Sequence, residues 1–294
     1  MPKYEFACPL TVAEGIETIS RINEDVVFLS GGTDLVIKLQ GGQMQPAWLM
    51  DVSLISELKF IKEVDGRIKI GSGTTFTQIS GSDLVRQKAR CLSQAASQVG
   101  STQIRNRATI GGNIANASPA GDSLPALLVL EAWVSIIGPQ GLRRVAFAQL
   151  QAGGGAGLQE RELITEIDFP LWEPQEKAQI ISAFGKIGSR TAVSIARLNM
   201  AAMVEFDAED NRIINSRWAV GALGRIPFRL EELERELQGK KVNPDLAGEI
   251  ADRLTGVVDR AIPGRSTQEY KRQAIRGLAY DLLGDLFPEQ ITKG

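Results

Sequence analysis

Short apolar runs, each stopped by a polar or glycine-rich turn, fill the first 170 residues and predict strands that alternate with helices. The run 26–29 stops at Ser30–Gly31–Gly32–Thr33–Asp34, after which apolar residues recur at helical spacing until Gly41–Gly42. We predict strands over 26–29, 48–52, 67–71, 133–137, 144–147 and 163–169, and helices over 35–40, 93–100 and 125–130. The turn 138–141 predicts a β-hairpin.

The pattern changes after residues 171–178, which we interpret as a domain boundary. Residues 199–207 and 213–220 alternate about the turn 208–211 and predict an antiparallel pair. Helices are expected over 230–237, 245–254 and 270–286, the last one carrying an apolar i, i+4 stripe that begins at Tyr270. The chain is therefore expected to have the α+β class. The expected domains are 1–172, with subdomains of about 1–55 and 56–172, and 178–290.

The composition excludes several kinds of chemistry but says less about the fold. The chain has 294 residues, a formal net charge of −2 and 43% hydrophobic residues, which is typical of an ordinary globular protein and offers no broad nucleic-acid footprint. No apolar run is long enough to span a membrane, and the first 15 residues have no signal-peptide core, so a cytoplasmic location is expected. Gly153–Gly154–Gly155 is interpreted as a short flexible loop.

The absence of histidine excludes a Ser-His-Asp triad and His-ligated metal sites. Only two cysteines, Cys8 and Cys91, are present, whereas an iron–sulfur cluster takes four ligands. We interpret both cysteines as small buried apolar residues. No catalytic side chain and no metal site are therefore predicted, and any redox chemistry must come from a bound organic cofactor.

Two glycine pairs are the strongest candidate binding features. Backbone N–H groups can approach a diphosphate closely where glycine removes the Cβ atom and allows positive φ. Asp34 or Thr33 could cap the helix that follows the first pair, whose positive end favours phosphate. Taken alone, the first pair is as compatible with a plain tight turn as with a phosphate loop.

The second pair, in Thr109–Ile110–Gly111–Gly112–Asn113, strengthens the case for a cofactor site. Neither pair fits G-x-G-x-x-G or G-x-x-x-x-G-K-[ST], which disfavours a Rossmann dinucleotide site and a P-loop. We therefore favour a site in which two loops from separate subdomains enclose one long cofactor.

These segments resemble the FAD-binding medium subunits of molybdenum hydroxylases, a family that includes xanthine, nicotinate and carbon monoxide dehydrogenase flavoproteins. The resemblance covers nearly the whole chain and rests on residues 29–35, 103–113, 118–122, 162–166, 184–186 and 270–272. It implies the FAD-binding fold of vanillyl-alcohol oxidase, built from two α/β subdomains, followed by a C-terminal α+β domain of the carbon monoxide dehydrogenase flavoprotein type.

The resemblance also implies roles for individual residues. Asp122 would accept hydrogen bonds from a cofactor hydroxyl, Ile164 would meet the isoalloxazine through its main chain, and Lys186 would lie near the pyrimidine edge. Each residue also has a simpler interpretation when taken alone: Asp122 as a helix cap, Ile164 as a core strand residue and Lys186 as a solvated charge. The implied cofactor-binding residues are Leu29, Ser30, Gly31, Gly32, Thr33, Asp34, Leu35, Thr109, Ile110, Gly111, Gly112, Asn113, Asp122, Ile164 and Lys186.

The function that the resemblance implies is an electron relay. A molybdopterin-binding large subunit would oxidise the substrate, a 2Fe-2S small subunit would pass electrons to FAD, and NAD or another acceptor would receive them. A self-contained flavin oxidase or dehydrogenase of the same fold is the alternative, although such enzymes usually anchor the flavin on His or Cys. An accessory protein whose flavin loops serve assembly is a third reading, which the intact glycine pairs and Lys186 disfavour.

Overall fold

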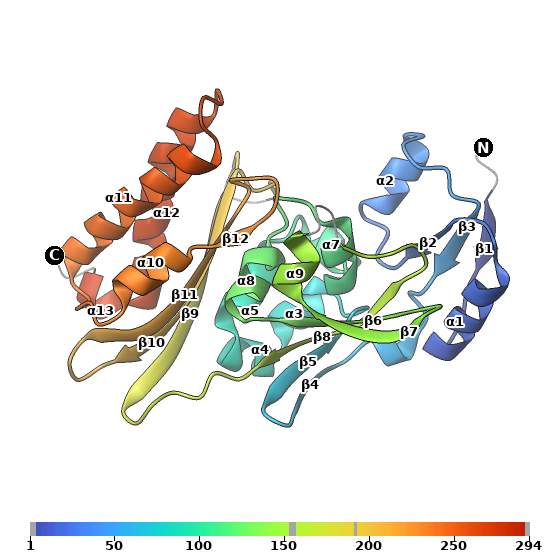
Figure 1. The fold of residues 1–294 in the computed structure, drawn as a ribbon, viewed down its shortest axis with the longest axis horizontal. Helices are drawn as coiled ribbons and strands as arrows, with labels where there is room; N and C mark the ends of the chain where they lie inside the picture. The colour runs from blue at the N-terminus through green and yellow to red at the C-terminus, as the bar shows by residue number, and fades with distance from the viewer. Residues whose placement is uncertain (1–3, 153–156, 191–192, 292–294) are drawn as a thin grey trace. The chain divides into compact units, whose positions relative to one another are not determined.

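The computed structural model describes residues 4–152, 157–190 and 193–291 of the chain (Figure 1). Two compact units share these residues, and each is discontinuous in sequence. The N-terminal unit comprises Met1–Leu84, Ser101–Ser118 and Glu131–Pro170, and the C-terminal unit comprises Val85–Gly100, Pro119–Leu130 and Leu171–Gly294. The predicted contiguous domains, which divide the chain near residues 172–178, remain a prediction.

The N-terminal unit contains a parallel and an antiparallel sheet. The parallel sheet has the order β1-β3-β2, and the antiparallel sheet has the order β4-β5-β8-β6-β7. The strands are β1 (Glu5–Ala7), β2 (Val26–Leu29), β3 (Trp48–Asp51), β4 (Ile61–Val64), β5 (Arg67–Gly71), β6 (Trp133–Gly138), β7 (Gly141–Ala146) and β8 (Leu163–Pro170). The helices are α1 (Val12–Arg21), α2 (Leu35–Gln40), η1 (Ser56–Leu58), α3 (Phe76–Gly81), α6 (Thr102–Arg105), α7 (Ile110–Asn116) and α9 (Phe147–Ala152).

The C-terminal unit contains one sheet of order β12-β11-β10-β9. Its strands are β9 (Ala178–Ile187), β10 (Leu198–Asp207), β11 (Arg212–Gly221) and β12 (Phe228–Arg229). Its helices are α5 (Arg90–Gln98), α8 (Ser123–Val129), α10 (Glu231–Leu237), α11 (Pro244–Ala261), α12 (Gln268–Leu286) and α13 (Pro288–Ile291), while α4 (Asp83–Lys88) crosses the sequence boundary between the units.

The two faces of the C-terminal sheet serve different purposes. Trp218 and Met200 belong to a buried apolar core shared with α10, α11 and α12. Asn199, the neighbour of Met200 in sequence, points to the opposite face because side chains alternate along a strand, and there it bonds to Asp122. The face opposite this core is thus the one that carries a candidate binding group.

Helix α5 covers the free edge of β9. The Gln94 side-chain oxygen accepts the Phe184 N–H at 2.8 Å, and the Arg90 guanidinium donates to the Ser182 carbonyl at 3.3 Å. Asp285 of α12 accepts hydrogen bonds from both Arg90 and Gln94. The Ser182 carbonyl and the Phe184 N–H, in the middle of this edge strand, are therefore occupied.

Many predicted elements are confirmed, several with shifted ends. The predicted hairpin forms as β6 and β7 but ends at Ala146, because Phe147 begins α9. The antiparallel pair of β10 with β11 and the helices α5, α8, α10, α11 and α12 also form. Strand β8 continues through Pro170, which pairs in register with Arg67. Strand β9 was not predicted, and neither was helix α7, because glycine pairs and strand glycines weaken both patterns.

Three expectations about individual residues need correction or comment. Cys91 is buried as expected, but Cys8 is exposed in the segment between β1 and α1 and is not a core residue. Tyr270, the first member of the apolar stripe, is 42% exposed, so the stripe packs against the core only from Ala274 onward. The predicted loop Gly153–Gly155 lies outside the described residues. No helix among the described residues is long and apolar enough to cross a membrane.

Candidate functional site

The first glycine loop connects β2 to α2 and carries unused hydrogen-bond donors. Among the residues that the structure describes, no acceptor is found for the N–H groups of Gly31, Gly32, Thr33 and Asp34. Gly32 has φ of +75°, a conformation that side-chain-bearing residues rarely adopt. Four successive free amides are chemically suited to an anion.

Asp34 occupies the N-cap position of α2 but does not cap it. Its side chain makes no capping hydrogen bond, and its backbone is already helical, with φ of −105° and ψ of −43°. One carboxylate oxygen instead accepts from Asn116 at 3.1 Å, and the other accepts from the Thr33 hydroxyl at 3.3 Å. The expectation that Asp34 or Thr33 caps this helix is therefore wrong, because the Asp34 carboxylate is turned toward other donors and the Thr33 hydroxyl is one of them.

The second glycine pair is the first turn of a helix rather than a loop. Thr109 is the N-cap of α7, and its hydroxyl accepts the Gly112 N–H at 3.2 Å. The N–H of Ile110 donates to the Thr74 carbonyl, and that of Gly111 donates to the Ser72 carbonyl at 2.9 Å. The amides of this segment are thus used internally, unlike those of the first loop.

Glycine is required in both segments because backbones approach each other there. A Cβ atom on Gly31 would lie 2.2 Å from the Arg107 carbonyl oxygen, and one on Gly111 would lie 2.6 Å from Ser72 Cβ. The hydroxyls of Ser30 and Thr109 are 3.1 Å apart. The two predicted segments therefore lie against each other within the N-terminal unit.

A polar chain joins α2 to the end of α7. The Lys38 ammonium donates to the Asn116 side-chain oxygen at 2.7 Å, and the Asn116 amide donates to Asp34 at 3.1 Å. Sequence reasoning missed both Lys38 and Asn116, because only the folded chain brings them beside the first loop.

Ile164 lies beside a β-bulge in β8. The register with β6 shifts so that Ile136 pairs with Ile164 whereas Ser135 pairs with Glu166, which leaves Thr165 as the extra residue. Thr165 accepts the Ser72 N–H at 3.0 Å, and the Ser72 carbonyl accepts the Gly111 N–H. Bulges commonly redirect strands at functional sites, and this one links Ile164 to the start of α7.

Asp122 and Lys186 form a buried ion pair in the C-terminal unit. The Lys186 ammonium lies 2.6 Å from Asp122 Oδ2, and each side chain is 7% exposed. Lys186 also donates to the Gln98 carbonyl at the end of α5, at 3.0 Å. The simpler readings of these residues therefore fail: Lys186 is not a solvated charge, and Asp122 makes no capping hydrogen bond to α8.

Asn199 completes this buried cluster. Its amide donates to Asp122 Oδ1 at 3.1 Å, while its own oxygen has no hydrogen-bond partner among the described residues. That oxygen would lie 2.3 Å from a Cβ on Gly221, so only glycine fits there. Burial raises the pKa of Asp122 above its ordinary value, and the charge and hydrogen bonds of Lys186 and Asn199 offset part of that shift.

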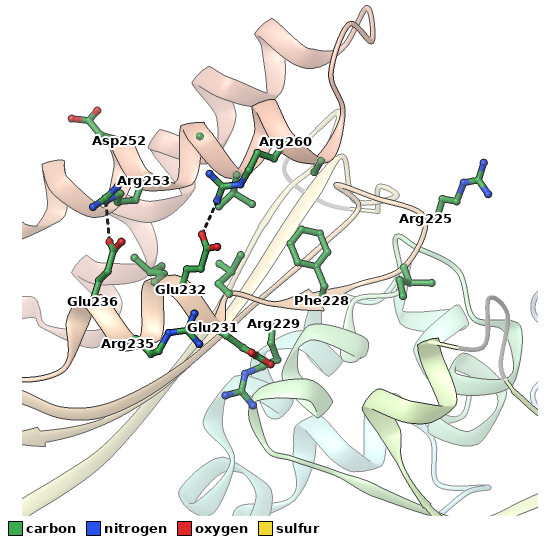
Figure 2. Close-up of a pocket in the computed structure, with 16 residues that line it drawn as sticks. Arg225, Phe228, Arg229, Glu231, Glu232, Arg235, Glu236, Asp252, Arg253 and Arg260 are labelled. Carbon is green, nitrogen blue, oxygen red and sulfur yellow. Dashed lines mark hydrogen bonds and ion pairs between the residues drawn. The ribbon is translucent and has the colours of Figure 1, made fainter.

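The predicted site residues are thus gathered in two groups. Leu29–Leu35, Thr109–Asn113 and Ile164 belong to the N-terminal unit, and Asp122 with Lys186 belongs to the C-terminal unit. A separate open cavity of about 680 Å³ lies in the C-terminal unit and contains none of them. Figure 2 shows that the ion pairs Arg253–Glu236 and Arg260–Glu232 bridge α10 and α11 there.

Comparison with known proteins identifies the class of fold. Carbon monoxide dehydrogenase from Hydrogenophaga pseudoflava gives a TM-score of 0.85 at 24% identity, with 98% of both chains covered. Quinoline 2-oxidoreductase from Pseudomonas putida gives a TM-score of 0.86 at 20% identity, with 97% of both chains covered. The α+β fold is therefore that of the flavoprotein chains in molybdenum hydroxylases, as expected.

Sequence comparison gives the family. Residues 2–172 match the FAD binding domain in molybdopterin dehydrogenase, and residues 183–286 match the CO dehydrogenase flavoprotein C-terminal domain. The chain is 30% identical to the nicotinate dehydrogenase FAD-subunit of Eubacterium barkeri, with 98% of both covered. It is 29% identical to the xanthine dehydrogenase FAD-binding subunit of Escherichia coli O157:H7, over 94% of this chain and 93% of the relative. The chain belongs to the family of FAD-binding subunits of molybdenum-dependent dehydrogenases, and is an oxidoreductase subunit.

Proposed function

We propose that this chain binds FAD non-covalently and relays electrons from 2Fe-2S clusters of a small partner subunit to NAD or another acceptor. The substrate would be oxidised in a molybdopterin-binding large subunit, within a xanthine-dehydrogenase-like complex in the cytoplasm. The observation that carries this proposal is the first glycine loop, whose four free amides lie against the Thr109–Asn113 segment.

The donor set of this loop fits a dinucleotide diphosphate. Gly31, Gly32, Thr33 and Asp34 offer consecutive N–H groups, which together can bind the oxygens of a diphosphate. The family match to an FAD binding domain supports FAD as the molecule concerned. Leu29–Leu35 and Thr109–Asn113 would hold the diphosphate. When bound, FAD supplies the redox chemistry, because a flavin accepts electrons singly and releases them in pairs.

Other residues of the chain would orient the cofactor. Each Asp122 oxygen accepts one hydrogen bond from the protein, so a second acceptor position on each remains for a cofactor hydroxyl. The buried Lys186 ammonium uses two acceptors and keeps a third proton for the pyrimidine edge. Ile164, beside the bulge, would meet the isoalloxazine through its main chain.

The residue content of the sequence supports the assignment of the iron–sulfur clusters to another subunit. Two distant cysteines and no histidine leave no ligands for an iron–sulfur cluster. Relatives named as FAD-subunits and medium chains support a multi-subunit assembly. The large and small subunits are accordingly proposed as partners.

The experiment compares the chain alone with the reconstituted complex. The isolated chain with FAD should reduce an artificial dye with NADH, but should not oxidise xanthine or another N-heterocycle. Heterocycle oxidation should appear only when the partner chains are added. Steady turnover of a purine by the chain alone, free of molybdenum and iron by metal analysis, would favour a self-contained oxidase and overturn the relay.

A further inference from the structure

Lys38 carries a positive charge that no acidic group of the described residues neutralises. It lies one helical turn after Asp34, and residues four apart on a helix can form a direct ion pair. The Asn116 side chain lies between them instead. Its oxygen accepts a hydrogen bond from the Lys38 ammonium at 2.7 Å, and its amide donates one to Asp34 at 3.1 Å. No ion pair of Lys38 is found among the described residues.

The position of Lys38 directs this charge toward the first glycine loop. Side chains on a helix lean toward its N-terminus, and Lys38 reaches Asn116, which in turn contacts Asp34 of the loop. Thr33 and Asp34 contribute two of the four free amides. Any anion bound there meets the negative charge of the Asp34 carboxylate, so a nearby cation that this carboxylate does not neutralise is needed to offset the repulsion.

We propose that Lys38 supplies the counter-charge for the FAD diphosphate at the first glycine loop, and that Asn116 holds its ammonium away from Asp34. This inference rests on the proposed FAD binding and adds two residues to it. Lys38 acts through its charge, and Asn116 is a positioning residue that acts through Lys38.

The test measures FAD affinity of the full-length apo chain by flavin fluorescence at low and high salt. Lys38→Met should weaken FAD binding about tenfold at low salt, which corresponds to about 1.4 kcal/mol. The difference should shrink at high salt because screening weakens charge interactions. Lys38→Arg should bind nearly as wild type, and Asn116→Ala should lose affinity as Lys38 pairs directly with Asp34.

Lys62→Met is the matched control, because it removes an exposed lysine of the N-terminal unit with the same change in net charge. Riboflavin, which has no phosphate, should not distinguish Lys38→Met from wild type. Equal FAD affinity of Lys38→Met and wild type at low salt would overturn the inference. So would a salt-independent loss that Lys38→Arg does not rescue, since that outcome indicates a structural role. Failure of wild type to bind FAD would contradict the proposed function instead.

Discussion

Lys186 and Asp122 show how burial changes the meaning of a charged residue. Each side chain is 7% exposed, and the two are 2.6 Å apart. Removing one partner leaves an uncompensated buried charge, which costs far more than losing a surface ion pair. A residue that resembles a solvated lysine in the sequence is therefore a sensitive position in the fold.

Lys186→Met should lower the free energy of unfolding by roughly 3 kcal/mol at pH 8. The loss should be smaller at pH 5, because the pKa of Asp122 is raised by burial and the variant also lacks the ammonium that lowers it. A raised pKa in the folded state means that the folded protein binds this proton more tightly, so stability falls as pH rises through that pKa.

Urea denaturation at both pH values measures this effect, and Asp122→Asn added to Lys186→Met should recover much of the loss. Lys240→Met is the control, because its ion pair with Glu249 is about half exposed and should be worth less than about 1 kcal/mol. An identical loss at pH 5 and pH 8 would show that charge burial is not the cause.

The two cysteines should differ in reactivity. Cys8 is exposed, whereas Cys91 is fully buried and burial raises its pKa to about 11. A thiol-specific reagent at pH 8 should therefore label one thiol per native chain and two after denaturation, and Cys8→Ser should abolish native labelling. Rapid labelling of Cys91 in the native protein would contradict the buried position.

Strands and helices with strong local patterns could be predicted from the sequence, whereas elements defined by their neighbours could not. The 133–147 hairpin follows from alternation and a turn, both local signals. Helix α7 was missed because Gly111 and Gly112 suggest a loop. In the structure Gly111 approaches Ser72 closely, and the Gly112 N–H donates to the hydroxyl of the N-cap residue Thr109. Strand β9 contains Gly185, which weakens the strand pattern, and it pairs with β10 across residues 188–197 rather than across a short turn.

Gly31→Ala should destabilise the N-terminal unit by about 1–3 kcal/mol, because its Cβ would lie 2.2 Å from the Arg107 carbonyl oxygen. Gly81→Ala is the matched control, since a Cβ there meets nothing within 4 Å. Gly81 is the last residue of α3, and alanine has a higher helix propensity than glycine. Thermal unfolding should separate the two variants in opposite directions. Equal melting temperatures would indicate that the Gly31 backbone moves freely to admit the methyl group.

At the scale of the whole chain, the candidate site residues could be proposed from the sequence, but their contacts with one another could not. The motifs around Gly31, Gly111, Asp122 and Lys186 are visible in the sequence and led to the family. Their partners Asn116, Ser72, Gln98 and Asn199 carry no local signature and emerge only when distant segments meet. The compact units, which take α5 and α8 into the C-terminal unit, likewise depend on long-range contacts.

The purified chain should be yellow and should release FAD on acid precipitation. The sequence has no histidine to anchor the flavin covalently. Chromatography of the supernatant identifies the flavin, with an unprecipitated sample as the control for total content. FMN in the supernatant, or flavin that stays with the pellet, would contradict the assignment of a non-covalent dinucleotide.

The cover that α5 provides over β9 bears on how this chain associates with others. An uncovered edge strand has unpaired N–H and C=O groups that can pair with a strand of another chain, which is a common route to aggregation. Here Arg90 binds the Ser182 carbonyl and Gln94 binds the Phe184 N–H, so a foreign strand must first displace both side chains to reach these two groups. Addition of a strand at this edge would therefore compete with both hydrogen bonds. The hydrogen bonds that hold α5 against the strand carrying Lys186 thereby also hinder pairing of this edge with a second chain.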